Sequence, residues 1–435
     1  MKMLEKFRNN IFWAKDRFTN SSLILKNYKE IKTINENPTS ETSKKLIEKN
    51  LSNLLEYAVK ETEFYKNINP EDILNFPIID KSIISANNND FLTLDKKYLK
   101  SSTTSGSTGH PLTVYQDKKK IDRHTADMIY FNEIANYNLG NRLYYFRVWN
   151  NKNAKSSLES FLHNIKMIDI SNFSIDKLNN LINSLSNDKS TKSILSFASS
   201  LEILENHIKT ESLDLQDVKL KSIISMSEAL PISTKKFLMQ QFHCPVFSRY
   251  SNMENGFIAQ QQKNSEDYYI NNASFYVEIL KFDENIRAED GEMGRIVVTD
   301  LFNYGMPIIR YDTGDIGVFS NINGSVILKS IEGRKTDFIY DVNGNVLSPH
   351  VITNTMWFFA NEVNQFQFIQ HDLNNYEIKI NLKKSDTVFL AEKLNKHLKT
   401  YLGDDANIKQ TFVDEIPVLS SGKRKKVVNL MNTKR

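Results

Sequence analysis

The sequence predicts an α/β protein with a large N-terminal domain and a small α+β C-terminal domain. Strand-like and helix-like patterns alternate between residues 143 and 248, which is typical of an α/β core. From Tyr268 onward strand-like runs replace the helix patterns and indicate a β-rich subdomain. After the polar turn at 333–337 a short series of strand and helix patterns begins again. We therefore predict an N-terminal domain at 1–336 and a C-terminal domain at 337–435.

Composition excludes several classes of protein. The chain has 435 residues, enough for two or three domains, and a net charge of +4, without the concentrated basic face of a nucleic-acid binder. Its one cysteine, Cys244, allows no internal disulfide and is expected to be a small buried residue. Residues 1–20 are too charged for a signal peptide, and no apolar run reaches the length of a membrane span. We expect a cytoplasmic protein.

The segment 4–18 combines Phe7, Ile11, Phe12 and Trp13 with basic residues. Such a mixture is found in helices that lie on a membrane surface. It is more often the pattern of a helix that packs on its own domain, and this is what we expect here. Peripheral membrane contact stays open as the alternative.

Individual elements follow from periodicity and from turn residues. Apolar residues at helical spacing predict a helix over 46–59, and Asp80 is a candidate N-cap for a short helix that starts at Lys81. Asn343 and Gly344 mark a hairpin turn, and residues 149–192 form a polar connection rich in Asn and Ser. Further helices are expected at 118–137, 201–208, 234–242, 349–361 and 387–402. Strands are expected at 112–115, 143–148, 193–197, 222–226, 246–248, 274–280, 294–299, 307–311, 326–330, 366–369, 376–382 and 410–413.

The stretch STTSGSTGHP, residues 102–111, contains three Ser, three Thr and two Gly and ends in Pro111. Glycine permits backbone conformations that other residues resist, and successive N–H groups and hydroxyls can turn inward around an anion. No Gly-Lys-Ser/Thr follows at Walker spacing, and the strand expected directly afterwards favours a hairpin-like phosphate grip. By composition alone, a solvent loop is the competing interpretation.

Three later segments carry further candidate groups. In 249–254, the ring of Tyr250 could stack on a purine and Glu254 could hold Mg²⁺ between phosphates, or both could be ordinary packing and surface residues. In 310–317, Asp312 and Asp315 flank Gly314 in what reads as a tight turn, and a carboxylate there could accept hydrogen bonds from a ribose diol. In 419–423, Lys423 follows Ser and Gly on a mobile loop, or belongs to a frayed basic tail.

Taken in order, these segments resemble the adenylate-forming superfamily of acyl-CoA synthetases, peptide-synthetase adenylation domains and luciferases. The likeness is greatest to the phenylacetate–CoA ligase branch and its relatives in capsular-polysaccharide gene clusters, and it runs from about residue 50 to the C-terminus. It rests on the segments TSGSTGHP (104–111), SMSEALP (225–231), YSNMENG (250–256), MPIIRYDTGD (306–315), EGRKTD (332–337) and LSSGK (419–423).

The resemblance implies a role for each matching residue. The ATP phosphates would be wrapped by the loop residues Ser105, Gly106, Ser107, Thr108 and Gly109, with Thr108 also taking part in catalysis. The nucleoside would be bound by Ser227, Glu228, Tyr250, Ser251, Asn252, Asp315 and Arg334. Glu254 would bind Mg²⁺, Asp337 would be the hinge of a rotating C-terminal lid, and Lys423 would bridge carboxylate and α-phosphate during adenylation.

The segments that would bind the acyl group depart from the family pattern. Phe146, Arg147 and Trp149 stand where a glycine-rich segment is expected, and Ser199 ends a Ser-Phe-Ala-Ser stretch that resembles Gly-Tyr-Pro-Ser. We expect these four residues at the acyl pocket. Arg147 is either a surface arginine or the partner of a second anionic group, for example on a sugar nucleotide or a uronic acid. Ser251 replaces the family's glycine after the tyrosine.

The predicted function is ATP-dependent activation of a small carboxylate through an acyl-adenylate, with Mg²⁺ and release of pyrophosphate. The acyl group would pass to an amine, as in an amide ligase of surface or capsular polysaccharide biosynthesis, with a sugar nucleotide or glycan among the candidate partners. One alternative is an acid–CoA ligase, with the thiol of coenzyme A as acceptor. Another is a catalytically silent nucleotide-binding protein, which the presence of Lys423 and Glu254 disfavours.

Overall fold

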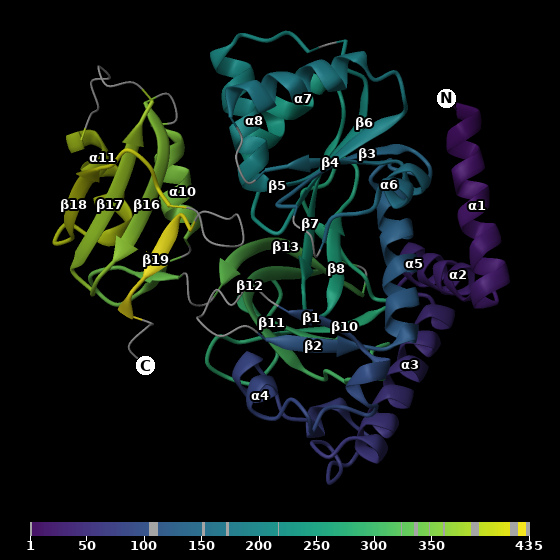
Figure 1. Ribbon diagram of the computed structural model, residues 1–435. Helices are drawn as coiled ribbons and strands as arrows, with labels where there is room; N and C mark the ends of the chain where they lie inside the picture. Colours follow the sequence, from purple (N-terminus) through teal and green to yellow (C-terminus); the bar gives the residue numbers. More distant parts are fainter. Residues whose placement is uncertain are drawn as a thin grey trace. The chain divides into compact units, whose positions relative to one another are not determined.

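The computed structural model describes residues 2–103, 112–149, 153–170, 174–215, 217–322, 324–334, 338–347, 349–359, 362–383, 391–417 and 425–431. The chain divides into two compact units (Figure 1). The first consists of Met1–Thr313 and Val318–Ser330, and the second of Gly314–Gly317 and Ile331–Arg435. Each unit has its own hydrophobic core.

One mixed sheet organises the first unit. Within the described residues it has eleven strands in the order β10-β11-β12-β13-β9-β8-β7-β6-β5-β3-β4. The strands from β7 to β4 run parallel to one another, whereas β8 is antiparallel to both β7 and β9. Their bounds are β3 Arg142–Arg147, β4 Ile165–Asp169, β5 Lys192–Phe197, β6 Leu220–Met226, β7 Val246–Asn252, β8 Gly256–Gln261, β9 Tyr268–Ile270, β10 Phe275–Leu280, β11 Met293–Asp300, β12 Tyr311–Ile322 and β13 Ser325–Arg334.

Helices α7, α8 and α9 cover one face of the parallel strands, whose successive side chains point to opposite faces of the sheet. Tyr144, Ile194 and Ile223 pack in one apolar cluster with residues of α7, α8 and α9, while Leu195 and Ile224 face the other way. The covering helices are α7 Ile175–Asn187, α8 Ala198–Thr210 and α9 Ile232–Phe242. Figure 1 shows α7 and α8 lying beside β5 and β6.

The polar connection predicted between residues 149 and 192 is wrong as to structure. It contains α6 (Ser157–His163), β4 and α7. The many Asn and Ser residues of this segment obscure the apolar stripe of α7 in the sequence. In the structure its buried residues recur at helical spacing and are Leu178, Leu181, Ile182 and Leu185.

The N-terminal segment is helical and is followed by the predicted hairpin. Its elements are α1 Lys2–Asn20, α2 Leu23–Glu36, α3 Glu41–Glu61, the 3₁₀ turn η1 Ile73–Asn75, α4 Lys81–Ala86, the 3₁₀ turn η2 Lys96–Tyr98, β1 Lys100–Thr103, β2 Thr113–Gln116 and α5 Lys118–Ile134. The antiparallel pairing of β1 with β2 confirms that a strand returns after the Ser/Thr/Gly loop, and Asp80 caps α4 by accepting from the backbone N–H of Ile83 at 2.9 Å. Among the described residues, no helix is both long and apolar enough to cross a membrane.

The strand predicted at 307–311 is wrong. Ile308 and Ile309 are buried in a cluster with residues of α3, but the segment is irregular and β12 begins only at Tyr311. Arg310 has a left-handed backbone, with φ of 51°, and its guanidinium donates to both carboxylate oxygens of Glu278 at 2.9 and 3.1 Å. This buried ion pair holds a conformation that a residue with a Cβ rarely adopts.

The second unit is a small α+β fold. Its described strands form a sheet in the order β18-β17-β16-β19, in which β16 and β17 are antiparallel and both outer pairs are parallel. Its elements are β14 Ile339–Tyr340, β15 Val346–Leu347, α10 His350–Trp357, β16 Val363–Gln370, β17 Asn375–Leu382, α11 Ala391–Leu402, β18 Asn407–Phe412 and β19 Val427–Asn429. Leu394, Leu398 and Leu402 of α11 pack against the apolar face of the sheet. The predicted hairpin turn is confirmed, since β14 pairs with β15 and Gly344 has a positive φ.

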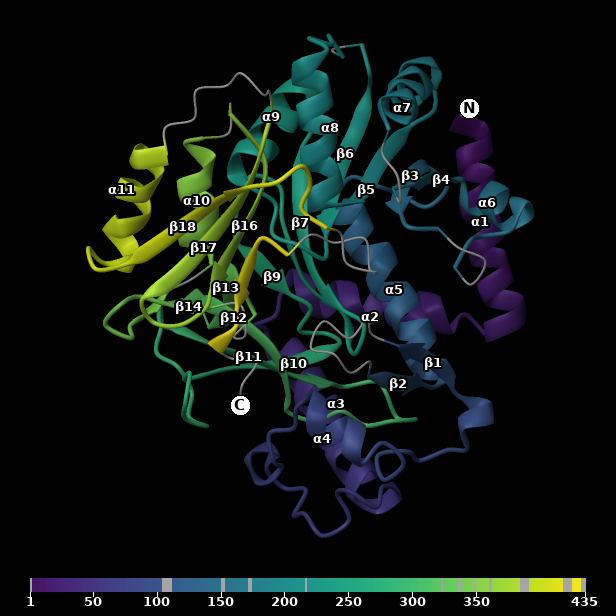
Figure 2. The same ribbon diagram turned by 60° about the vertical axis from the view of Figure 1, so that its left-hand side comes forward.

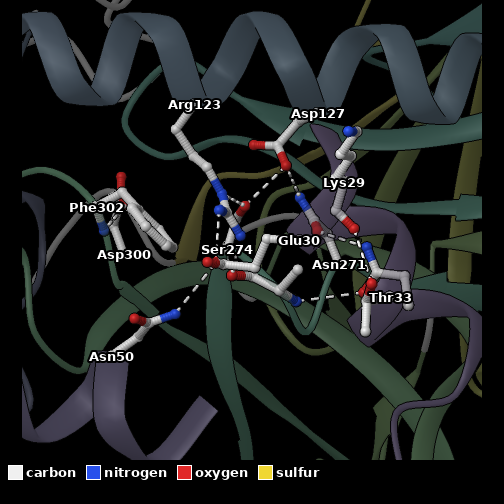
Figure 3. A network of polar contacts seen from close by, with 12 residues as sticks. Lys29, Glu30, Thr33, Asn50, Arg123, Asp127, Asn271, Ser274, Asp300 and Phe302 are labelled. Carbon is white, nitrogen blue, oxygen red and sulfur yellow. Dashed lines mark hydrogen bonds and ion pairs between the residues drawn. The ribbon is translucent and has the colours of Figure 1, made fainter. Parts of the chain in front are cut away.

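Helix α5 is fastened to the rest of the first unit by a buried arginine (Figure 3). The guanidinium of Arg123 donates to the carboxylate of Glu30 and the hydroxyl of Ser274, both at 2.8 Å, and to the carbonyl of Ala273 at 2.5 Å. It also lies 3.8 Å from the ring centroid of Phe302. The arginine therefore joins α5 to α2 and to the turn before β10.

Three further buried charges lie near Arg123. The Asp127 carboxylate accepts from Ser274 at 2.7 Å and from Asn271 at 2.8 Å, so it shares its partner with the arginine network (Figure 3). One helical turn before Arg123, the ammonium of Lys120 lies 2.6 Å from the carboxylate of Asp300, and both side chains are fully buried. Breaking a buried ion pair leaves an uncompensated charge in the interior, so these contacts fix where α5 lies.

The C-terminal end of α5 is joined to the β7–β8 hairpin. Arg249 donates to Asn132 at 2.7 Å and to Gln260 at 3.0 Å, and Gln260 in turn donates to the carbonyl of Phe131 at 2.8 Å. The rings of Phe131 and Phe257 stack with centroids 4.4 Å apart. Burial lowers the pKa of Arg249 to about 9. Helix α5 thus connects the hairpin β1–β2 with the hairpin β7–β8.

We expect Asp300→Asn to lower the free energy of unfolding by about 3–5 kcal/mol, because it leaves the Lys120 ammonium buried without its counter-charge. Urea denaturation measures the change. A Lys120→Met/Asp300→Leu double variant is the control and should recover most of the loss. An Asp300→Asn protein within about 1 kcal/mol of the parent would contradict the role given to this pair.

Candidate active site

Several predicted site residues lie at the carboxyl ends of parallel strands. β3 ends at Arg147, β5 at Phe197, β6 at Met226 and β7 at Asn252. The carboxyl ends of neighbouring parallel strands meet at one edge of the sheet, and open α/β sheets bind ligands there. Ser199, Ser227, Glu228, Ser251 and Asn252 all fall at or just beyond this edge.

The turn between β7 and β8 is linked to the start of β12 by two hydrogen bonds. The Tyr250 hydroxyl donates to the Thr313 hydroxyl at 3.3 Å, and the Tyr311 hydroxyl donates to the Glu254 carboxylate at 3.1 Å. Tyr250 and Glu254 are both largely buried. Thr313 is itself oriented by donating to the carbonyl of Ile296 at 2.8 Å. Two sequence segments some sixty residues apart are therefore brought together, with a tyrosine contributed by each.

The backbone of this turn is shaped by its polar residues. The side-chain oxygen of Asn252 accepts from the backbone N–H of Asn255 at 2.8 Å, which closes the turn around Glu254. Ser251 is half-buried on β7 at the position of a register shift against β8. Asn252 thus supports the turn.

The segment after β6 contacts the segment after β5. The carboxylate of Glu228 accepts from the backbone N–H of Ser199 at 3.0 Å. Ser227 is exposed and has a positive φ of 68°. This bond brings together a residue predicted for the nucleotide and one predicted for the acyl group.

The three aromatic and basic residues at the end of β3 have different surroundings. Phe146 is fully buried in the core formed with α7 and α8, so packing accounts for its side chain. The Arg147 guanidinium lies 5.9 Å from the ring centroid of Trp149, and the Trp149 indole donates to the carbonyl of Tyr145 at 3.3 Å. Arg147 is half-buried. Arg147 and Trp149 are therefore the two of these residues whose half-buried side chains lie near the carboxyl end of β3.

The predicted tight turn at Asp312–Asp315 is wrong. All of 311–322 is strand β12, with Gly314 at a φ of 74°. The carboxylate of Asp312 is ion-paired with Arg295 at 2.6 Å, which accounts for it structurally. Asp315 is half-buried on the same strand, and Arg334 is the last residue of β13.

Other predicted residues lie outside the described part of the chain. These are the loop residues Ser105, Gly106, Ser107, Thr108 and Gly109, the hinge residue Asp337 and the catalytic candidate Lys423. Among the described residues, no group of three or more His, Cys, Asp or Glu side chains is arranged to hold a metal ion.

His124 is a site-proximal residue that the sequence analysis did not assign. A Cβ at Gly256, where φ is 99°, would lie 2.8 Å from its Nδ1 atom, so the ring packs directly on the turn after Glu254. That nitrogen is buried and has no hydrogen-bond partner in the described part of the chain. Burial, together with Lys120, Arg249 and Lys100, lowers the pKa of His124 to about 3. The imidazole is therefore neutral at physiological pH.

Comparison with known proteins places the fold. Residues 339–430 match the family model for the CapK C-terminal domain. Over 400 residues the chain is 24% identical to protein CapK of Staphylococcus aureus, covering 86% of each. It resembles a 2-hydroxyisobutyryl-CoA ligase in the postadenylation state in complex with R3-HIB-AMP, with a TM-score of 0.70, 15% identity and 91% of each chain covered.

Two other solved structures are similar over a smaller share. ATP-bound MatB from Rhodopseudomonas palustris gives a TM-score of 0.56 at 14% identity, over 75% of this chain and 66% of that one. The anthranilate CoA ligase AuaEII in complex with anthranoyl-AMP gives a TM-score of 0.55 at 15% identity, over 76% of this chain and 66% of that one. The predicted fold is confirmed: the chain has the α/β adenylate-forming fold, with a large N-terminal and a small C-terminal domain, and is a distant homologue of protein CapK.

We expect His124 to make the protein sensitive to mild acid. Its pKa lies near 3 in the folded protein against an ordinary value of 6.5, so the unfolded chain binds the extra proton. Stability from this group is thus fully present above pH 6.5 and is lost as the pH falls toward 3. Urea denaturation at about pH 7 and about pH 5 measures the free energy of unfolding at each pH. The decrease between the two pH values should be smaller for His124→Gln than for the parent. Equal losses in the two proteins would contradict this assignment.

Proposed function

We propose that this protein activates a carboxylate with ATP, forming an acyl-adenylate and releasing pyrophosphate. The observation that supports this most directly is the pair of hydrogen bonds between the β7–β8 turn and the start of β12. Tyr250 donates to Thr313, and Tyr311 donates to Glu254. These bonds join the two segments to which the family resemblance gives the adenine, magnesium and ribose contacts.

The residues of the turn suit the nucleotide. The ring of Tyr250 offers a flat face for adenine, and its hydroxyl is held by Thr313. Asp315, two residues beyond Thr313 on β12, would accept from the ribose hydroxyls. Arg334, Ser227 and Glu228 complete the proposed nucleoside contacts, and the loop 105–109 would wrap the phosphates.

The surroundings of Glu254 fit Mg²⁺. Magnesium is commonly held by one or two carboxylates together with substrate phosphates and water, so a three-carboxylate cluster is not required. One oxygen of Glu254 accepts from Tyr311, and the described residues offer no hydrogen-bond partner for the other. A magnesium ion bound there would neutralise phosphate charge.

The chain's own task is to bring two anions together. Carboxylate attack at the α-phosphate forms an acyl–phosphate bond and breaks the α–β phosphoanhydride, so pyrophosphate leaves with the electron pair. We assign Lys423 the role of placing a cation between the carboxylate and the α-phosphate. A C-terminal unit that hinges at Asp337 would deliver this lysine and withdraw it before acyl transfer.

We propose an amine as the acyl acceptor, as in an amide ligase of surface polysaccharide biosynthesis. Arg147 and Trp149, which stand in place of a glycine-rich acyl pocket, support an acceptor different from that of the CoA ligases. Arg147 would pair with a second anionic group on the substrate, such as that of a uronic acid or a sugar nucleotide. Formation of a CoA thioester is the alternative, because the 2-hydroxyisobutyryl-CoA ligase shares the fold.

We expect Lys423→Ala to reduce carboxylate-dependent ATP–pyrophosphate exchange by at least about a hundredfold, the loss typical of one electrostatic catalytic group. Lys425→Ala, two residues away, is the matched control and should keep most of the activity. The assay uses purified protein, Mg·ATP and a panel of carboxylic acids. Unchanged exchange in Lys423→Ala would refute the lysine assignment, and absence of exchange in the parent across the panel would favour a silent nucleotide-binding protein.

The same reaction distinguishes the acceptors. Once an acid supports exchange, adding amines or coenzyme A in separate reactions should accelerate pyrophosphate release only with the true acceptor. Amide formation with an amino sugar supports the first proposal. Thioester formation with coenzyme A alone would replace it with the acid–CoA ligase.

A further inference from the structure

Helix α1 has the opposite amphipathicity from that expected of a surface helix. A helix packed on a soluble domain ordinarily buries its apolar stripe and exposes its charges. In α1 the buried residues include Glu5, Arg8 and Asp16, whereas five apolar side chains are exposed and Phe12 and Trp13 are half-buried. The feature lies far from the candidate active site in sequence and is not accounted for by the proposed function.

The polar face of α1 makes hydrogen bonds to the body of the first unit. Glu5 accepts from the backbone N–H of Thr191 at 3.1 Å and from the side chain of Asn141 at 3.2 Å. Asp16 accepts from the backbone N–H groups of Ile24 and Leu25 at 3.2 and 3.0 Å, and so caps α2. These contacts fix which face of α1 is turned outward.

The outward face is a single apolar stripe. Met3, Phe7, Ile11 and Phe18 recur at intervals of four or seven residues, which places them along one side of the helix over about 22 Å. Phe7 is 58% exposed and Phe18 86% exposed. Isolated apolar side chains on a surface need no explanation, but an aligned and contiguous set marks an interaction surface.

Helix α6 extends this stripe. The Arg8 guanidinium donates to the carbonyl of Phe161 at 2.9 Å and lies 4.8 Å from the Phe161 ring centroid. Leu158, Phe161 and Leu162 of α6 are also exposed. Figures 1 and 2 show α1 and α6 side by side in both views. We call the exposed apolar residues of both helices the α1–α6 ridge.

Basic residues border the ridge. Lys6, Lys15 and Arg17 of α1 are exposed, while both acids of α1 are buried on the opposite face. Lys15 also lies close enough to His163 of α6 to contribute, after burial and Lys155, to lowering the pKa of that histidine. The exposed acid of α6 is Glu159, whose carboxylate is held by the backbone and hydroxyl of Ser156 at 2.9 and 3.1 Å.

We infer that the α1–α6 ridge docks on the surface of an anionic lipid bilayer. An apolar face bordered by cations matches the boundary between acyl chains and negatively charged headgroups, where amphipathic helices lie in the plane of the membrane. The ridge is formed by side chains that project from two neighbouring helices. The exposed cations Lys6, Lys15 and Arg17 complement anionic headgroups, and the apolar side chains between them suit the acyl-chain boundary. This places the enzyme at the membrane surface.

The test is co-sedimentation of the full-length protein with vesicles. The probe is a vesicle of equal parts phosphatidylglycerol and phosphatidylcholine, compared with one of phosphatidylcholine alone. We expect binding to the anionic vesicle that falls as salt is raised. Phe7→Glu should abolish it. A Lys6→Gln/Lys15→Gln/Arg17→Gln variant should weaken it on the order of a hundredfold, at about 1 kcal/mol or fivefold for each charge.

Leu74→Glu is the matched control, because Leu74 is 63% exposed on the same unit but lies outside the ridge. It should bind vesicles like the parent, and unfolding curves of all variants should coincide, since every substituted side chain is exposed. Equal binding to both vesicles, or no binding to either, would overturn the inference. If the protein instead forms a dimer in sedimentation velocity that Phe7→Glu dissociates, a second copy covers the ridge and the lipid proposal is wrong.

Discussion

The buried charges of α5 are the constraint on which the first unit depends. Lys120 pairs with Asp300 of β11, and Arg123 pairs with Glu30 of α2, in surroundings where an unpaired charge would cost several kcal/mol. These pairs hold the helix that directly follows the β1–β2 hairpin. At its other end α5 carries Asn132, which binds Arg249 of β7. A single helix thus connects the β1–β2 hairpin with the β7–β8 turn.

This connection explains how the β7–β8 turn of the candidate site is held in place. The β7–β8 turn presents Tyr250 and Glu254, and both are tied to the start of β12 by tyrosine and threonine hydroxyls. His124 on α5 packs against Gly256 of the same turn. Because the imidazole stays neutral, it adds no charge beside the carboxylate. The turn is therefore held from two sides, by β12 and by α5, before any ligand binds, which lowers the entropy lost when a nucleotide is ordered.

Sequence reasoning worked where local patterns decide the structure. The helix predicted at 46–59 lies within α3, and periodicity and turn residues located the elements of the second unit except β19, which was not predicted. It failed where distant partners decide. Lys120 and Arg123 look like solvated helix residues until Asp300 and Glu30 are placed beside them. Asp312 looked like a ribose ligand because Arg295, its partner on the neighbouring strand, gives no local signal. The inverted faces of α1 were likewise hidden, since only tertiary contacts show which face is buried.

The central claim is that one nucleotide site joins the β1–β2 hairpin to the β7–β8 turn. Hydrogen exchange of the full-length protein with and without Mg·ATP tests this most directly, because it reports where ligand binding slows the opening of backbone amides. We expect protection of 100–116 and of 249–257 together, with no change in α1 or in β4. Protection confined to other segments, for example around Arg142 and Asp188 at the polar hollow of about 460 Å³ beside α7, would contradict the account.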